Sequence, residues 1–262
     1  MNEFLRPLGN TGIQVSAIGL GTVKIGRNEG VKYPQGFSIP DDDAVTRLLD
    51  SARDLEINVI DTAPAYGTSE TRLGNLLRHR QDWVIVSKTG EEFENGHSAF
   101  DFTPEHTRYS VQRSLQRLKT DYIDVVLIHS DGNDMDIIHQ FGTLEALDEL
   151  KKEGMIRAYG LSGKTCQGGL TALQRSDVAM VTSNLRYNDE QAVIDYAAQH
   201  SKGVFIKKAL ASGHLDGVDG DAVQLSFDKL LHTEGVSSLI IGTINPTHLK
   251  ENLIKARKSL SW

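Results

Sequence analysis

The sequence has too few cysteines and too few long apolar runs for several classes of protein. It contains one cysteine, Cys166, so no disulfide can form within the chain, and we expect a reducing compartment. No segment approaches the roughly 18 consecutive apolar residues that mark a bilayer-spanning helix. The first ten residues lack the apolar core of a secretory signal. These absences predict a cytoplasmic protein without a membrane partner.

The chain also has fewer basic than acidic residues. The chain carries 28 Lys and Arg against 35 Asp and Glu, a formal net charge of -7. Non-specific binding to nucleic acid or to an anionic membrane requires clustered basic side chains. We therefore expect neither partner, although a local basic pocket for a phosphate group is compatible with this balance.

What the chain does contain is a repeated alternation of short apolar runs and longer amphipathic segments. The short runs are apolar on successive residues and rich in β-branched side chains, which is typical of strands buried on both faces of a parallel sheet. We expect strands at residues 16–20, 58–60, 83–86, 123–128, 156–161, 178–182, 203–206 and 238–241.

Helices are expected between these strands. Apolar residues at steps of three and four fall on one helix face, and the dipeptides Thr103-Pro104 and Asn245-Pro246 are typical of helix starts. We expect helices around residues 45–55, 68–77, 103–118, 141–150, 164–173, 188–199, 221–233 and 246–257.

Eight strand–helix units without a break in composition favour an α/β fold, a closed (β/α)8 TIM barrel over residues 1–262 as one domain. The 262 residues fit a barrel of about 250, although two small domains would fit that length too. An open doubly wound sheet is the alternative, but no Gly-rich dinucleotide fingerprint follows the first strand. Residues 8–13 predict an N-terminal β-hairpin that plugs the bottom of the barrel. Residues 27–40 and 90–102 are expected to be long loops at the mouth.

Three of the predicted strands end in a polar residue directly after an apolar run. These residues are Asp61, Lys88 and His129. In a barrel the carboxyl ends of the strands meet at one mouth, where enzymes of this architecture carry their sites. A carboxylate, an ammonium and an imidazole are costly to desolvate singly, so we expect Asp61 to pair with Lys88 there.

Tyr66 follows Asp61 after a turn bracketed by Pro64 and Gly67, so it can lie at the same mouth. A phenol titrates near 10 in water. A neighbouring Lys88 ammonium would lower that pKa, which suits a general acid. Each residue alone also has an ordinary structural explanation, such as an N-cap for Asp61 or packing for Tyr66. The four together favour a catalytic site.

Three segments carry a resemblance to a known family. They are Asp-Thr-Ala-Pro-Ala-Tyr-Gly at 61–67, Ser-Lys-Thr at 87–89 and Leu-Ile-His-Ser at 127–130. They resemble the catalytic segments of the aldo-keto reductases, and the glycine patterns at 8–12 and 18–22 resemble that family's start. The resemblance runs through nearly the whole chain. It implies metal-free reduction of an aldehyde or ketone by a nicotinamide cofactor on a (β/α)8 barrel.

The resemblance also implies the role of each residue. Tyr66 would be the acid, Lys88 would lower its pKa, Asp61 would pair with Lys88, and His129 would orient the carbonyl. Ser162 and Asn184 would hold the nicotinamide amide, and Lys207 stands where many members stack a tyrosine on that ring. The remaining expected cofactor contacts are Gly21, Thr22, Lys208, Leu210, Ser212, Leu215, Gly242, Thr243, Asn245, His248, Glu251 and Asn252.

The cofactor is expected to be NADP, bound as NADPH, because most members of the family use it. The basic residue that commonly holds its 2′-phosphate is missing at Gly242 and His248, which leaves NADH open. Two other functions also stay open. One is a slow redox sensor or partner subunit on the same barrel, and the other is a lyase or isomerase with Lys88 as a Schiff-base amine. A monomer or a small homo-oligomer is expected.

Overall fold

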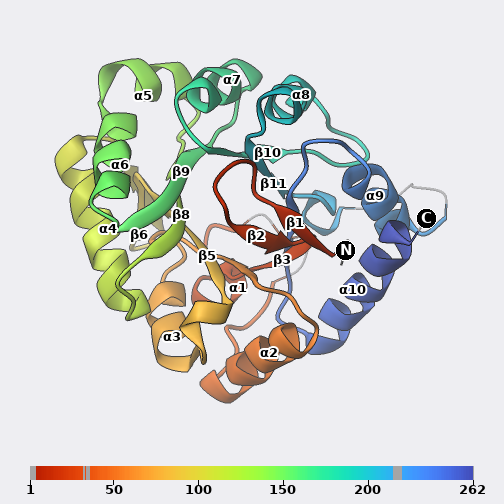
Figure 1. Cartoon of the computed structure of the whole chain (residues 1–262). Coiled ribbons are helices and arrows are strands. Elements are labelled where there is room, and N and C mark those ends of the chain that lie inside the picture. The colour runs from red at the N-terminus through yellow and green to blue at the C-terminus, as the bar shows by residue number, and fades with distance from the viewer. Residues whose placement is uncertain (1–3, 32, 34–35, 215–219, 262) are drawn as a thin grey trace.

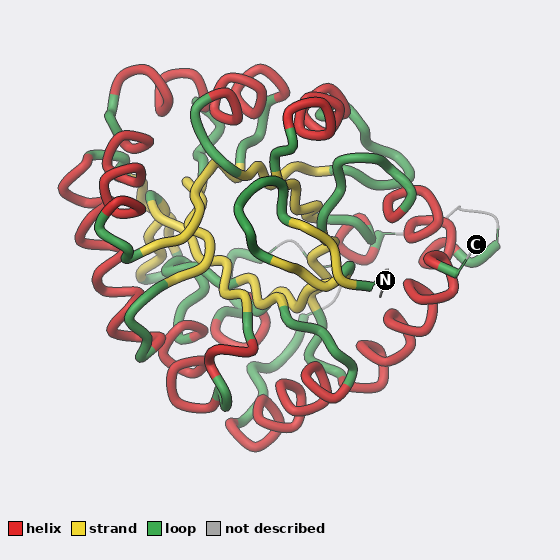
Figure 2. The backbone as a smooth tube through the Cα atoms, viewed as in Figure 1, coloured by secondary structure: helices red, strands yellow, loops and turns green. Residues whose placement is uncertain are grey.

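The computed structural model describes residues 4–31, 33, 36–214 and 220–261. Eight parallel strands close into a barrel, with β12 hydrogen-bonded to β3 to complete the ring. Figures 1 and 2 show this ring of strands surrounded by helices. The strands, in their order around the barrel, are β3 (Ile18–Gly21), β4 (Val59–Asp61), β5 (Val84–Thr89), β8 (Ile123–His129), β9 (Ile156–Ser162), β10 (Val178–Thr182), β11 (Gly203–Lys207) and β12 (Ser238–Gly242).

The outer layer contains all eight helices that the sequence predicts. Two further short helices, α1 (Val23–Gly26) and α5 (Asp134–Gln140), were not predicted, because neither is long enough to show a helical repeat. The eight predicted helices are α2 (Asp42–Asp54), α3 (Ser69–Leu76), α4 (Pro104–Leu118), α6 (Thr143–Lys152), α7 (Cys166–Gln174), α8 (Gln191–His200), α9 (Ala222–Leu231) and α10 (Pro246–Leu260).

The two predicted helix starts are confirmed. The Thr103 side chain accepts a hydrogen bond from the His106 backbone N–H at the start of α4, and the Asn245 side chain accepts one from Thr247 at the start of α10. Each cap is followed by a proline, which lacks the N–H that the first turn would leave unpaired.

Thr103→Ala is expected to lower the free energy of unfolding by about 1 kcal/mol, because it removes the acceptor that caps α4. Thr103→Ser keeps that oxygen and should unfold close to wild type. Urea denaturation of both variants, compared at their midpoints, measures the difference. Equal midpoints for wild type and Thr103→Ala would show that the cap contributes nothing.

An N-terminal hairpin closes one end of the barrel, as the sequence predicts. Strands β1 (Leu5–Pro7) and β2 (Gln14–Ser16) pair antiparallel, and Figure 1 shows them in red across the opening that faces the viewer. Leu8, Ile13 and Val15 are buried among the apolar residues that fill the barrel interior. The hairpin therefore plugs this end.

The interior residues of the strands lead directly to the polar residues at the other end. In β5 the interior residue Val86 is followed two positions later by Lys88, and in β8 Leu127 is followed in the same way by His129. In β4, Val59 is followed by Asp61. Because side chains alternate between the faces of a strand, these three point into the mouth. None of the helices in the described parts of the chain combines the length and apolar character that crossing a bilayer demands.

Candidate active site

Asp61 and Lys88 form a buried ion pair at the mouth of the barrel. The Lys88 Nζ lies 2.5 Å from the Asp61 Oδ1 and also donates to the Thr62 carbonyl oxygen at 2.9 Å. Both side chains are almost fully buried. A buried charge of either sign is costly alone, so each is held by the other. The predicted pairing is confirmed.

Tyr66 lies beside this pair on the turn after β4. The Lys88 Nζ is 4.8 Å from the centre of the Tyr66 ring, and the His129 ring meets that ring edge-on, with the centroids 6.2 Å apart. The turn is built on Gly67, whose φ of +61° suits glycine. The four residues that the sequence singled out thus gather in one cluster.

The expectation that Lys88 lowers the pKa of Tyr66 is wrong for this structure. Burial raises the pKa of the Tyr66 phenol well above 10, although an edge of the side chain still reaches solvent. The negative charges of Asp61 and Glu91 raise that pKa further. The Lys88 charge does not reverse this, because Asp61 already neutralises it at close range. Tyr66 therefore keeps its proton throughout the neutral pH range.

His129 has a carboxylate partner that the sequence analysis did not identify. The Nδ1 of His129 lies 2.7 Å from the Oε2 of Glu91, a contact that is not aligned as a hydrogen bond and is an ion pair only when the imidazole is protonated. Burial lowers the pKa of His129, while Glu91 works in the opposite direction. Burial works to raise the pKa of Glu91, but contact with His129, the Ser98 hydroxyl and the charge of Arg27 outweigh it and hold that pKa at about 2.

Glu91 is placed by a small hairpin where the sequence analysis expected an irregular loop. Strands β6 (Glu91–Glu94) and β7 (His97–Phe100) pair antiparallel directly after β5. The predicted loop over 90–102 is therefore corrected, since its glycine and charge content concealed two short strands. Its predicted place at the mouth is confirmed by the contact between Glu91 and His129. The sequence offered one indication of this partner, a carboxylate three residues after Lys88, and that spacing alone does not indicate a contact with His129.

The other side of the mouth carries residues expected to bind the cofactor. Ser162 ends β9 and is buried, and Lys207 ends β11. The Lys207 Nζ donates to the Ser162 Oγ at 3.0 Å and to the Gly163 carbonyl oxygen at 2.6 Å. Burial lowers the pKa of Lys207 to about 8, and the nearby charges of Lys208 and Lys88 contribute. Two hydrogen bonds thus hold the Lys207 ammonium at the position where the family resemblance implied a stacked tyrosine.

The residues after β10 and β11 that were expected to bind the cofactor already make hydrogen bonds or packing contacts within the protein. The buried Asn184 accepts a hydrogen bond from the Arg186 N–H and donates one to the Lys208 carbonyl oxygen. Lys208 and Ser212 have left-handed backbone conformations, and Leu210 packs against the apolar core. Leu215 lies outside the described residues.

The remaining expected contacts lie around β3, β12 and the start of α10. The expected cofactor contact of Thr22 is corrected, because this residue is fully buried. Its hydroxyl donates to the Asp61 carbonyl oxygen and accepts from Ser69. It joins β3 to β4 and has no atom left for a ligand. The others are backbone positions at the mouth or residues in the first turns of α10: Gly21, Gly242, Thr243, Asn245, His248, Glu251 and Asn252.

These residues fit a nicotinamide dinucleotide. Gly242 ends β12 without a side chain, and a Cβ built there would lie 3.1 Å from the Tyr33 hydroxyl. The fifteen-residue helix α10 begins four residues later, and helix N-termini favour phosphate groups. Lys207, at the end of the neighbouring strand β11, and the adjacent Lys208 add positive charge. The buried Ser183 hydroxyl, next to Asn184, has no partner among the described residues. The unpaired Ser183 hydroxyl and the positive charge at this side suit a phosphate-bearing ligand with an amide.

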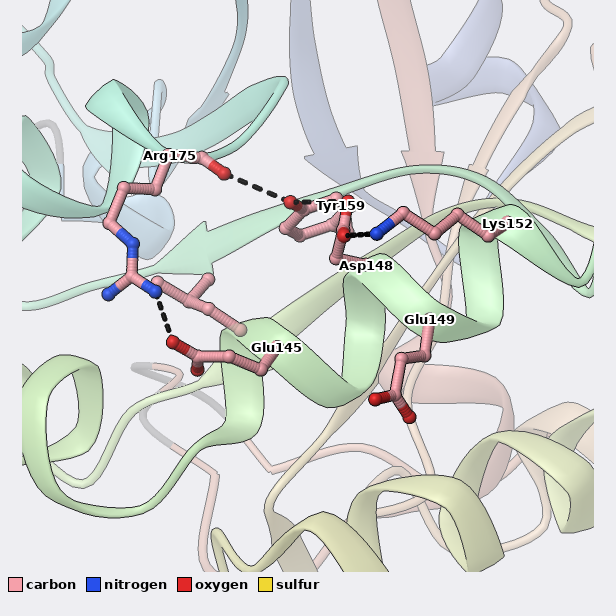
Figure 3. Close-up of a pocket in the computed structure, with 7 residues that line it drawn as sticks. Glu145, Asp148, Glu149, Lys152, Tyr159 and Arg175 are labelled. Atoms are coloured by element: carbon pink, nitrogen blue, oxygen red, sulfur yellow. Dashed lines mark hydrogen bonds and ion pairs between the residues drawn. The ribbon is translucent and has the colours of Figure 1, made fainter.

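A cavity of about 450 Å³ lies away from this mouth, on the outside of the barrel. Figure 3 shows Glu145, Asp148, Glu149 and Lys152 reaching it from α6, with Tyr159 of β9 and Arg175 after α7. The Tyr159 hydroxyl donates to the Arg175 carbonyl oxygen, and Lys152 pairs with Asp148. Arg175 pairs with Glu145 there, and the cavity holds none of the residues of the mouth. We therefore place the active site at the mouth.

Comparison with known proteins agrees with the family resemblance of the sequence motifs. A sequence model of the aldo/keto reductase family matches residues 17–229. L-galactose dehydrogenase of Arabidopsis thaliana is 34% identical over 226 residues, which cover 80% of this chain and 66% of that protein. The NADH-specific methylglyoxal reductase of Escherichia coli (strain K12) is 36% identical over 168 residues, covering 59% of this chain and 50% of that protein. The matched regions thus span half to two thirds of these relatives.

A solved structure matches over almost the whole chain. It is described as a candidate aldo-keto reductase from Pseudomonas aeruginosa, is 54% identical, and superposes with a TM-score of 0.89 over 98% of this chain and 95% of that one. Its likeness covers the strands that carry Asp61, Lys88 and His129. With the family match over most of its length, this chain belongs to the aldo/keto reductase family.

Proposed function

We propose that the protein reduces an aldehyde or ketone to an alcohol with a nicotinamide cofactor. The observation that carries this proposal is the cluster of Tyr66, Lys88, Asp61 and His129 at the barrel mouth. The bound cofactor would supply a hydride to the carbonyl carbon. Tyr66 would give its proton to the carbonyl oxygen, and His129 would hold that oxygen by hydrogen bonding. The raised pKa of Tyr66 keeps the proton available for this step.

Lys88 and Asp61 have a supporting role in this proposal. The Lys88 ammonium beside the Tyr66 ring stabilises negative charge as the phenol loses its proton, and Asp61 keeps Lys88 in place. The same pairing speaks against Lys88 as a Schiff-base amine, since an ammonium bonded to a carboxylate is not a nucleophile.

For the cofactor we propose Ser162 and Asn184 at the nicotinamide amide and the start of α10 at a phosphate. Ser162 still has its hydroxyl proton to donate, because it accepts from Lys207. NADPH is the proposed form on the family pattern. NADH is the alternative, supported by the relative whose name specifies NADH. The substrate would be a small carbonyl compound, such as methylglyoxal or an aldose.

Fluorescence titration with NADPH and with NADH, followed by turnover of 4-nitrobenzaldehyde, methylglyoxal and an aldose, tests this function. We expect micromolar binding of at least one cofactor and its oxidation with at least one carbonyl. Binding without turnover of any carbonyl would instead favour the redox sensor. That second function is supported by Lys207, which bonds to Ser162 where a stacked ring was expected. The same samples in sedimentation analysis decide between a monomer and a small homo-oligomer.

A further inference from the structure

Glu91 is a carboxylate at the mouth that the proposed reaction does not use. It begins β6, two residues after the end of β5, and its Oε2 lies 2.7 Å from the His129 Nδ1. The side chain is 12% exposed, and that of His129 is 22% exposed. A carboxylate this close to an imidazole in a partly desolvated site strongly affects where the ring carries its proton.

The Glu91 carboxylate is held in this position from several sides. The Ser98 hydroxyl, on the paired strand β7, donates to its Oε1 at 2.6 Å. Arg27 lies 3.7 Å from the same oxygen, stacks on Phe93 and donates to the Ala65 carbonyl oxygen next to Tyr66. One oxygen is thereby held by the hairpin and by Arg27, and the other is left facing His129.

This arrangement decides which nitrogen of His129 can serve the substrate. A neutral imidazole has one N–H, and an ionised carboxylate beside Nδ1 favours that proton on Nδ1. The Nε2 is then an acceptor and has nothing to donate to a carbonyl oxygen. It becomes a donor only when the ring takes up a second proton.

The charged groups around His129 set the pH at which this happens. Burial lowers the pKa of His129, and the positive charges of Lys88 and Lys207 lower it further. Glu91 is the group that raises it. Tyr66, the other titratable side chain against the ring, stays protonated and neutral. Among these groups, Glu91 is the one that favours the imidazolium, which is present below the pKa of His129 and is lost as the pH rises through it.

We infer that Glu91 is a positioning residue for carbonyl reduction, which fixes the proton of neutral His129 on Nδ1 and supports the doubly protonated ring that donates to the substrate from Nε2. The inference rests on the proposed function for its consequence in catalysis. Reduction should then fall as His129 loses its second proton, although Tyr66 is still protonated. Glu91 acts through His129 and touches neither substrate nor cofactor.

Imidazole ¹⁵N NMR of Glu91→Gln tests this directly, with His129→Gln used to assign the His129 signals. In wild type we expect neutral His129 to carry its proton on Nδ1. In Glu91→Gln we expect that preference to be lost and the pKa of His129 to fall by about one unit or more. The alkaline limb of the pH profile of kcat for reduction should change with it. An unchanged tautomer and pKa would overturn the inference.

Glu92→Gln is the matched control, since Glu92 follows on the same strand but contacts Arg113 and His106 instead. It should leave the His129 titration at its wild-type position. If Glu91→Gln does not fold, Glu91→Asp is measured in its place, with a smaller fall of the same pKa expected and no change overturning the inference. The NMR titration does not depend on turnover. An inactive protein with the expected His129 shift would therefore refute the proposed reaction alone.

Discussion

Tyr66→Phe is expected to reduce kcat for carbonyl reduction by about 10²- to 10⁴-fold, the usual contribution of a positioned general acid. The phenyl ring keeps the packing against His129 and the contact with the Lys88 ammonium, so only the transferable proton is removed. Cofactor affinity should change little. Steady-state turnover with a saturating carbonyl substrate, together with fluorescence titration of the cofactor, measures both quantities.

Tyr159→Phe serves as the control for this variant. The Tyr159 hydroxyl bonds to the Arg175 carbonyl oxygen at the outer cavity, so its loss affects packing outside the barrel and not the mouth. Turnover close to wild type is expected for Tyr159→Phe. If Tyr66→Phe also retained wild-type turnover, Tyr66 could not be the acid.

Lys88→Met is expected to lower the free energy of unfolding by about 3 to 5 kcal/mol at neutral pH, because Asp61 then keeps a buried charge without a partner. The methionine side chain fills nearly the same volume as the lysine stem, so a cavity adds little to this loss. Chemical denaturation of the cofactor-free protein measures the effect. Reduction should also fall steeply, since Tyr66 loses the adjacent cation.

The double variant Asp61→Asn with Lys88→Met separates the two contributions. It removes both charges, so we expect it to recover much of the lost stability without recovering turnover. A double variant as unstable as Lys88→Met would mean that shape, and not the unpaired carboxylate, accounts for the loss.

Most of the barrel could be predicted from the sequence, because its strands are buried on both faces and its helices on one. Because of this burial, all residues of a strand such as 123–128 are apolar except Asp124. The short helices α1 and α5 and the hairpin β6–β7 have no such run of apolar residues. They are only a few residues long, and no residue of the hairpin strands is fully buried, so neither an apolar period nor a buried face constrains their composition.

The cluster at the mouth was predictable for the same reason, since three of its members lie at the ends of buried strands, on the interior face. The pKa of Tyr66 was not, because it depends on how fully Asp61 compensates Lys88 and on how much the phenol is buried. Glu91 was also missed as a partner of His129. The two are 38 positions apart, and the return of the hairpin to the mouth is a property of its turn and of Arg27, which no local pattern reveals.

The N-terminal hairpin also affects how the barrel is completed. Arg6 donates to the Leu231 and Val236 carbonyl oxygens, 225 and 230 positions along the chain, and Asn10 donates its N–H to Ser201. The hairpin residues thus have hydrogen-bond partners that lie far along the chain. Contacts of such long range are slow to form. The apolar barrel residues that Leu8 covers therefore stay open to solvent, and to aggregation, until the hairpin has joined these distant segments.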